Sequence, residues 1–187
     1  MGREHKRQGL HIGLLLIAFS LKWLTAWQAA AVLAGLFLII AFALPKAGWR
    51  SHFYRRSEQR YSAGAMLYVA VLLGLVFFFP LSIVAASWAV LALGDGSATL
   101  FGQHFRAREL AWNKNKTYVG SLAFFVFATL GATVLLGWMM PELAFSVALG
   151  HAGRTALVAS LVESLPWRLN DNVTVPIASA LVLSYLL

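Results

Sequence analysis

The stretch that decides the fold runs from residue 63 to residue 101 and reads AGAMLYVAVLLGLVFFFPLSIVAASWAVLALGDGSATLF. Asp95 is its only charged residue, and Pro80 divides it into two apolar segments, each long enough to cross a bilayer as a helix. A carboxylate at the end of such a segment is costly unless it is paired, solvated or bound to a cation. The stretch therefore predicts two membrane helices, at about 63–79 and 81–101, with a polar group at the end of the second.

The rest of the chain has the same apolar character. Of its 187 residues, 60% are hydrophobic and 12% are charged, whereas a soluble domain has about 25% charged residues. The absence of cysteine excludes disulfides, thiolate chemistry and cysteine zinc sites. We expect an all-α membrane bundle of about seven transmembrane helices in a single integral membrane domain over residues 1–187. The other apolar runs lie at about 9–24, 27–44, 119–139, 142–162 and 172–187.

The basic residues predict the orientation of this bundle. The net charge is +8, and 13 of the 15 lysines and arginines fall on one side of the membrane if the N-terminus is cytoplasmic. Lys22 and Arg154 are the exceptions. The positive-inside rule then places every polar stretch long enough for chemistry on the cytoplasmic side. Because the basic residues cluster beside apolar runs rather than along one amphipathic face, we expect no nucleic-acid partner.

Asp95 lies among small and hydroxyl-bearing residues. Gly94 and Gly96 flank it, and Ser97 and Thr99 follow. Glycine commonly ends helices, so one interpretation is a helix-terminal turn with a solvated aspartate. Small residues and hydroxyls also let phosphate oxygens or Mg²⁺ approach the backbone closely. We favour this second interpretation and expect Gly94 to contribute to a nucleotide site.

A second polar segment opens the predicted helix at 119–139. The first turn of a helix offers free amides and a partial positive charge, which together attract anions. Two lysines add to this charge, although the segment lacks the glycine loop of a Walker motif. Charged residues that merely flank a membrane helix are the alternative. The residues that we expect to bind a nucleotide here are Lys114, Lys116, Thr117, Gly120 and Ser121.

A third polar cluster lies near the end of the chain. Glu163 closes the sixth predicted helix, and Asp171 and Asn172 open the seventh. One of the latter two is expected to cap that helix. Glu163 adds a carboxylate on the same membrane face as Asp95. Three of the seven acids in the chain thus meet at one boundary, which predicts a divalent-metal site formed by Asp95, Glu163 and Asp171.

Two further residues are candidates for contact with lipid or phosphate. Glu4, Arg7 and His11 lie at intervals of three and four, which place all three on one face of a helix. A lone histidine there is more often an interhelical hydrogen-bonding residue than a base. Arg154 lies inside the sixth predicted helix, where an arginine is expected to face the bundle interior and to pair with an acid or a substrate phosphate.

Four segments in a fixed order carry a resemblance to a known family. They are GDGSA at 94–98, NKNKTYVGSLAFF at 113–125, LVE at 161–163 and DNVTVPIASA at 171–180. This order resembles the CTP-dependent lipid-alcohol kinases, which include dolichol kinase, phytol kinase and the yeast-type diacylglycerol kinase and are distantly similar to phosphatidate cytidylyltransferases. The likeness covers about residues 90–180.

The resemblance implies a polytopic enzyme that transfers the γ-phosphoryl group of CTP to the hydroxyl of a polyprenol, phytol, dolichol or diacylglycerol. Asp95, Glu163 and Asp171 would hold Mg²⁺ as the cofactor, and each is a candidate for the catalytic base. Lys116 would be catalytic and would bind the phosphates together with Lys114 and Thr117, while Asn172 would bind metal or nucleotide. The expected partners are CTP, the lipid alcohol and the bilayer.

Two other functions stay open from the sequence. A cytidylyltransferase that forms a CDP-lipid would use similar residues. A non-enzymatic transporter would use intramembrane charges, but it would distribute them across the depth of the membrane rather than gather them on one side. The sequence leaves the oligomeric state open, including a homo-oligomer.

Overall fold

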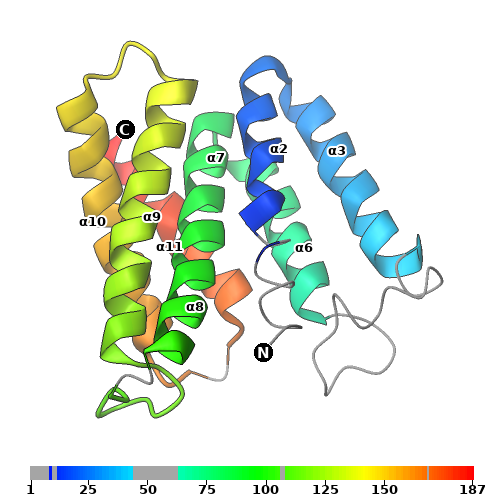
Figure 1. Cartoon of the computed structure of the whole chain (residues 1–187). Helices are drawn as coiled ribbons and strands as arrows, with labels where there is room; N and C mark the ends of the chain where they lie inside the picture. Colours follow the sequence, from blue (N-terminus) through cyan, green and yellow to red (C-terminus); the bar gives the residue numbers. More distant parts are fainter. Residues whose placement is uncertain (1–8, 10–11, 44–62, 106–107, 168) are drawn as a thin grey trace.

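A computed structural model describes residues 9, 12–43, 63–105, 108–167 and 169–187, and this part of the chain is a bundle of helices (Figure 1). His11 lies outside the described residues. The elements in chain order are α2 (Leu15–Ser20), η1 (Leu21–Trp23), α3 (Ala26–Leu38), η2 (Ile39–Ala43), α6 (Ala63–Phe78), α7 (Leu81–Ala89), η3 (Val90–Asp95), α8 (Gly96–His104), α9 (Tyr118–Met139), α10 (Phe145–Ser164) and α11 (Asp171–Leu186).

The prediction of an all-α bundle is confirmed. By length and composition, four helical stretches in the described part are able to cross a membrane: Ala26–Ala43, Leu81–His104, Tyr118–Met139 and Phe145–Ser164. The apolar helices α6 and α11 are shorter, with 16 residues each. The seven apolar runs of the sequence thus correspond to helices, and the orientation of the bundle stays a prediction.

Local sequence explains where several helices begin. Thr25 caps α3 through a capping box with Gln28, in which each side chain bonds the other residue's backbone amide. Pro80 precedes the first residue of α7, where its missing amide donor costs least. Thr117 and Asn170 cap α9 and α11. These caps fix where α9 and α11 begin, and the candidate site is built next to both of these helix starts.

The helix that carries Asp95 does not end at the two glycines. It passes from α7 through the π-helical turn η3 into α8, so the interpretation of a helix-terminal turn is wrong. Gly94 is buried against α9, where an added Cβ would lie 2.8 Å from the ring of Phe124. Close packing therefore explains this glycine. Single π-helical turns within longer helices occur frequently at functional sites.

The bundle is built around α9. This helix packs against α7, α8 and α10, and α10 packs in turn against α11, while α3 lies against α6 (Figure 1). In the core, the indole Nε1 of Trp88 donates to the hydroxyl of Tyr68 at 2.5 Å, so this buried polar pair is mutually satisfied. This packing brings four parts of the bundle close together: the last residues of η3 and α10 and the first residues of α9 and α11.

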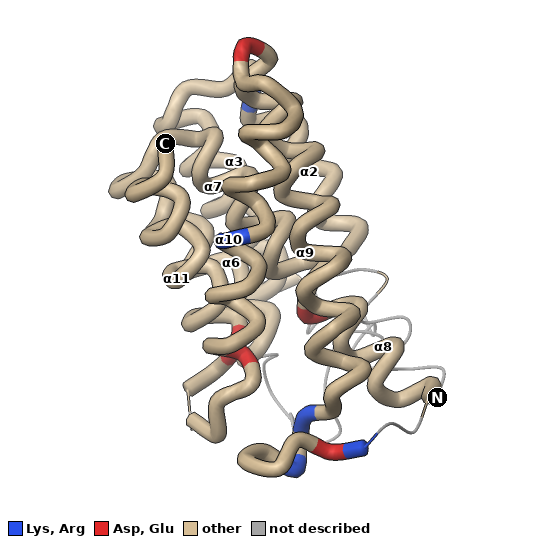
Figure 2. The backbone as a smooth tube through the Cα atoms, turned by 90° about the vertical axis from the view of Figure 1, so that its left-hand side faces the viewer, with Lys and Arg blue, Asp and Glu red and all other residues tan. Residues whose placement is uncertain are grey.

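Charged residues in the described part gather toward one end of this frame (Figure 2). The opposite end carries Lys22 and Glu142, and Arg154 lies midway along α10. This uneven distribution fits a site at the membrane boundary better than a polar path through the membrane.

Candidate active site

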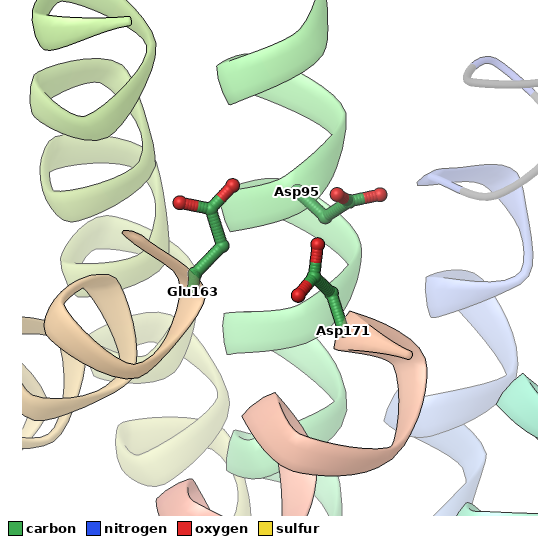
Figure 3. A group of neighbouring side chains, drawn as sticks. All are labelled: Asp95, Glu163 and Asp171. Carbon is green, nitrogen blue, oxygen red and sulfur yellow. The ribbon is translucent and has the colours of Figure 1, made fainter. Parts of the chain in front are cut away.

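Three carboxylates from distant parts of the chain lie together (Figure 3). Asp95 is the last residue of η3, Glu163 is the penultimate residue of α10, and Asp171 is the first residue of α11. One oxygen of each side chain lies within 4.8 Å of one oxygen of each of the others. The fold thus brings together the three acids that the sequence singled out, because each stands at a helix end or turn on the same side of the bundle.

Lys116 joins two of these acids. Its ammonium Nζ donates to Glu163 Oε1 and, at 2.7 Å, to Asp171 Oδ2. Glu163 is 2% exposed, so its charge requires a close partner. Burial of the ammonium by itself lowers the pKa of Lys116, but the two carboxylates raise it more, and the pKa lies above the ordinary 10.5. Lys116 is therefore a permanent cation at physiological pH.

Two carboxylates of the cluster have oxygens without a partner among the described residues. Within the described residues, Glu163 Oε2 is buried and accepts no hydrogen bond. Asp95 likewise has no hydrogen bond or ion pair among the residues that the structure describes. Buried oxygens without donors are costly. Carboxylate oxygens are also the ligands that Mg²⁺ prefers, so this donor set fits a divalent cation.

The cap of α11 explains why Asp171 is available. Asn170, and not Asp171 or Asn172 as predicted, caps the helix, and its Oδ1 accepts from the amide of Asn172 at 3.0 Å. Asp171 is thereby left to bind Lys116. The side chain of Asn172 is buried, and its Nδ2 donates to the carbonyl of Gly64 at 2.9 Å. That nitrogen is therefore engaged in a contact between α11 and α6.

The loop before α9 is fastened to the end of α10. Asn113 is buried, and its Nδ2 donates to the carbonyl of Ser164 at 3.1 Å, while its Oδ1 accepts from the amide of Asn115. The indole of Trp112 donates to the same carbonyl of Ser164 at 3.1 Å. These bonds hold Lys116 beside Glu163. Sequence reasoning assigned no role to Asn113 or Trp112, although Asn113 opens the segment 113–125 that carries part of the family resemblance.

A cavity of about 230 Å³ adjoins the charged cluster. Its lining includes Thr99, Lys116, Thr117, Gly120, Ser121 and Glu163. An added Cβ at Gly120 would lie 3.0 Å from the carbonyl oxygen of Ala98, so this glycine lets α8 and α9 approach closely. The Ser121 hydroxyl is buried and has no partner within the described part of the chain. The cavity therefore combines a cation with an unused hydroxyl.

The amides at the start of α9 are less available than the sequence suggested. Thr117 Oγ1 accepts from the amide of Gly120 at 3.1 Å, and the amide of Tyr118 donates to the carbonyl of Arg108. The amide of Ser121 donates to the carbonyl of Thr117. The expectation of free amides is thus wrong for these three groups, because the cap and the loop use them. The helix dipole and the charge of Lys116 still favour an anion here.

The remaining candidates lie apart from this cavity. Gly94 does not line it. Lys114 is exposed and lines a separate, open cavity of about 430 Å³ with Arg108, Glu109 and Tyr118. The two lysines that the sequence grouped together therefore face different cavities, and of the two only Lys116 bonds acids of the cluster, namely Glu163 and Asp171.

Arg154 does not face the bundle interior, and that expectation is wrong. Its side chain is exposed on α10. Nine residues separate it from Glu163, which corresponds to about 13 Å along a helix. The reason lies in the packing of α10, which buries a stripe of small residues on the opposite face: Ala148, Ala152, Ala156 and Ala159.

Comparison with known proteins gives a consistent set of relatives. The chain is 35% identical over 129 residues to a probable chloroplastic phytol kinase of Triticum aestivum and 31% identical over 128 residues to phytol kinase 1 of Arabidopsis thaliana. These matches cover 64% and 63% of this chain but only 42% and 41% of the relatives, so the chain spans less than half the length of these chloroplastic proteins.

A phytol kinase of Synechocystis sp. matches over a larger part. It is 30% identical over 190 aligned residues, which cover 96% of this chain and 78% of the relative. No protein-family model and no solved structure matches the chain. On the strength of the match that extends over nearly the whole chain, this protein belongs to the phytol kinase family of lipid-alcohol kinases.

Proposed function

We propose that this protein transfers the γ-phosphoryl group of CTP to the hydroxyl of an isoprenoid alcohol such as phytol, with Mg²⁺ as cofactor. The observation that carries the proposal is the meeting of Asp95, Glu163 and Asp171 with Lys116, beside a cavity large enough for phosphate groups. The names of its relatives support a lipid alcohol as the acceptor. The choice of CTP rests on the sequence resemblance.

The three carboxylates would hold the metal ion. Their oxygens are hard ligands, and the partnerless Glu163 Oε2 and the Asp95 carboxylate have ligand capacity that the described protein groups do not use. When bound, the ion would neutralise charge on the donor phosphates. The packed helices fix the position of the ion, since one carboxylate comes from the π-helical turn η3, one from the last turn of α10 and one from the first residue of α11.

The phosphate chain of the donor would lie in the cavity beside these acids. Lys116 provides the positive charge there, and Ser121 offers a buried hydroxyl without a protein partner. Gly120 leaves room for close approach to the backbone. Lys114 stands outside this cavity, so we assign phosphate binding to Lys116 alone. Phosphoryl transfer needs positioning and charge neutralisation more than covalent participation by the protein.

The chemical step would be a single displacement. The oxygen of the lipid hydroxyl attacks the γ-phosphorus, the bond from this phosphorus to the β–γ bridging oxygen breaks, and CDP leaves. The hydroxyl proton passes to a carboxylate. Asp95 is our candidate for this base, because it forms no hydrogen bond or ion pair with any residue that the structure describes.

The site's place in the bundle suits an acceptor with a long apolar tail. The charged residues of the described part gather toward one end (Figure 2), where a hydroxyl at the membrane boundary could meet a water-soluble nucleotide while the tail stays in hydrocarbon. We place this end on the cytoplasmic side by the positive-inside rule. The same one-sided distribution argues against a transporter.

The test uses purified protein with phytol and CTP labelled in either the α- or the γ-phosphate. A kinase places the γ-label, and not the α-label, in the lipid. A cytidylyltransferase supplied with a phosphorylated lipid would place the α-label in the lipid and release the γ-label as pyrophosphate, which would overturn the proposal. Parallel reactions with UTP, ATP and GTP, and with polyprenol, dolichol and diacylglycerol, determine the donor and the acceptor.

A further inference from the structure

We propose that Lys116 is a built-in counter-cation that holds the place of the divalent ion between Glu163 and Asp171 until the donor arrives. When the ion binds, the ammonium leaves these carboxylates for the donor phosphates. This inference rests on the proposed function, since it concerns how the same site is loaded. It adds that the metal ion competes with Lys116 for the carboxylates and that phosphates attract the same lysine, so metal binding and phosphate binding support each other.

The position of the ammonium is the first support. Nζ contacts one oxygen of Glu163 and, at 2.7 Å, one oxygen of Asp171, two of the three acids whose oxygens converge. A cation bound to those same oxygens would have the ammonium as its immediate neighbour, and like charges repel strongly where water is scarce. The structure thus shows a monovalent cation at the position that suits a divalent one.

The charge balance is the second support. Asp95, Glu163 and Asp171 carry three negative charges when ionised, and Lys116 is the only basic residue in the described part that forms an ion pair with any of them. An ionised carboxylate as deeply buried as Glu163 is costly without a neighbouring cation. Lys116 supplies this cation, and a divalent ion would supply it instead.

The cavity provides the destination. Lys116 lines it and is 22% exposed, so its side chain is neither fully enclosed nor far from open space. The lysine stem is flexible, and its ammonium bonds as a point charge rather than in a fixed geometry. Phosphate groups in the cavity would give the ammonium new anionic partners beside the unused Ser121 hydroxyl. By linkage, phosphates that attract Lys116 would strengthen metal binding, and metal would strengthen phosphate binding.

The test measures Mn²⁺ affinity without nucleotide, by the electron paramagnetic resonance signal of free Mn²⁺ over purified protein. Because Lys116→Met removes the competing charge, we expect it to tighten Mn²⁺ binding on the order of tenfold, within the usual range of site-to-site coupling. Lys114→Met is the matched control, because it removes the same charge from a lysine that lines the other cavity. We expect it to leave Mn²⁺ affinity unchanged. Equal or weaker Mn²⁺ binding by Lys116→Met would overturn the proposal.

A second measurement guards against a misfolded variant. Lys116→Gln retains a hydrogen-bond donor for the two carboxylates, and it too should bind Mn²⁺ more tightly than the wild type does. Mn²⁺ should raise the Tm of both variants more than it raises that of the wild type, because only the variants leave Glu163 without a cation. Equal shifts would count against the proposal.

These outcomes are separable from those of the proposed function. If the wild type phosphorylates phytol but neither variant gains Mn²⁺ affinity, the counter-cation is refuted and the kinase assignment stands. If the variants gain Mn²⁺ affinity but the wild type phosphorylates no lipid alcohol, the counter-cation stands and the kinase assignment fails.

Discussion

Two lysines at the two ends of α9 have opposite surroundings. Lys116 precedes the helix, is largely buried, and bonds two carboxylates. Lys22 lies at the far end, about 33 Å away along 22 helical residues. It is exposed, and its ammonium donates to the carbonyl of Trp138 at 2.7 Å and lies 4.7 Å from the centre of that residue's ring. Among the residues that the structure describes, Lys22 thus has only neutral partners, whereas Lys116 has acids.

The difference shows what each end of the bundle does. The indole of Trp138 donates to the carbonyl of Phe19 at 3.0 Å, so the contacts at the Lys22 end join α9 to α2. Aromatic and basic residues of this kind are typical anchors at a membrane interface. At the Lys116 end, charge is concentrated and some oxygens lack partners. We therefore expect substitutions at one end to affect activity and those at the other to affect stability alone.

The largest contrast should come from two glutamates. Glu163→Gln removes a charge from the cluster and should lower lipid phosphorylation by about 10³-fold, the scale of losing one strong electrostatic contact to a transition state. Glu142→Gln makes the same change at the exposed turn after α9 and should leave the rate unchanged. Initial rates with CTP and phytol measure both. Similar rates for the two variants would show that the Lys116 end of the bundle is no more important for activity than the Lys22 end.

The two lysines themselves give the next contrast. Lys116→Met should reduce the phosphorylation rate about 100-fold, because the phosphates lose their cation. Lys22→Met should leave the rate unchanged and cost about 1 kcal/mol of stability, the usual scale for an exposed cation–π contact. Rates and thermal unfolding are measured on the same preparations. A large loss of rate in Lys22→Met would show that the far end is not merely structural.

Two glycines on α9 sharpen the comparison further. An added Cβ at Gly120 would lie 2.9 Å from Thr117 Oγ1 and 3.0 Å from the carbonyl of Ala98, whereas Gly137 has nothing within 4 Å. Gly120→Ala should therefore destabilise the protein by about 1–3 kcal/mol and lower activity by disturbing the cavity. Gly137→Ala should be neutral or stabilising by up to about 1 kcal/mol. Chemical denaturation checks both, and equal effects would argue against close packing at the cavity.

The smallest expected effect concerns pH. The carboxylates outweigh burial and raise the pKa of Lys116 above 10.5, so the ammonium persists at lower pH and is lost only as the pH rises beyond that value. The ratio of wild-type to Lys116→Met rates should therefore stay constant from about pH 7 to about pH 9.5. A ratio that falls within this range would mean that Lys116 loses its proton early and lacks the anionic partners that keep it charged.

Much of the fold could be predicted from the sequence, because long apolar runs have few alternatives to helices in a membrane. The face that each helix buries could not be predicted as well. On α10 the buried residues are four alanines and four polar residues, and the exposed ones include Leu157 and Leu161, so hydrophobicity does not distinguish the two faces. Arg154 was expected to face inward because it is a charge within a membrane helix, but it lies on the exposed face.

The acids of the site could be predicted from the sequence, but the residues that bond to them and position them could not. Asp95, Glu163 and Asp171 were noticeable in the sequence because the chain has few acidic residues, and the fold brings these three together. That Lys116 rather than Lys114 reaches them depends on how Asn113 fastens the loop to α10, which no local pattern reveals. That Asn170 provides the cap of α11 depends on the backbone conformation of one residue.

The measurement that tests the central claim most directly is the transfer of γ-labelled phosphate from CTP to phytol by wild-type protein and Asp95→Asn, assayed side by side with Mg²⁺. The substitution keeps the size of the side chain and removes only its charge. We predict label in the lipid for the wild type and none above background for Asp95→Asn, with unchanged thermal unfolding. Equal incorporation by the two proteins would contradict the assignment of this cluster as the active site.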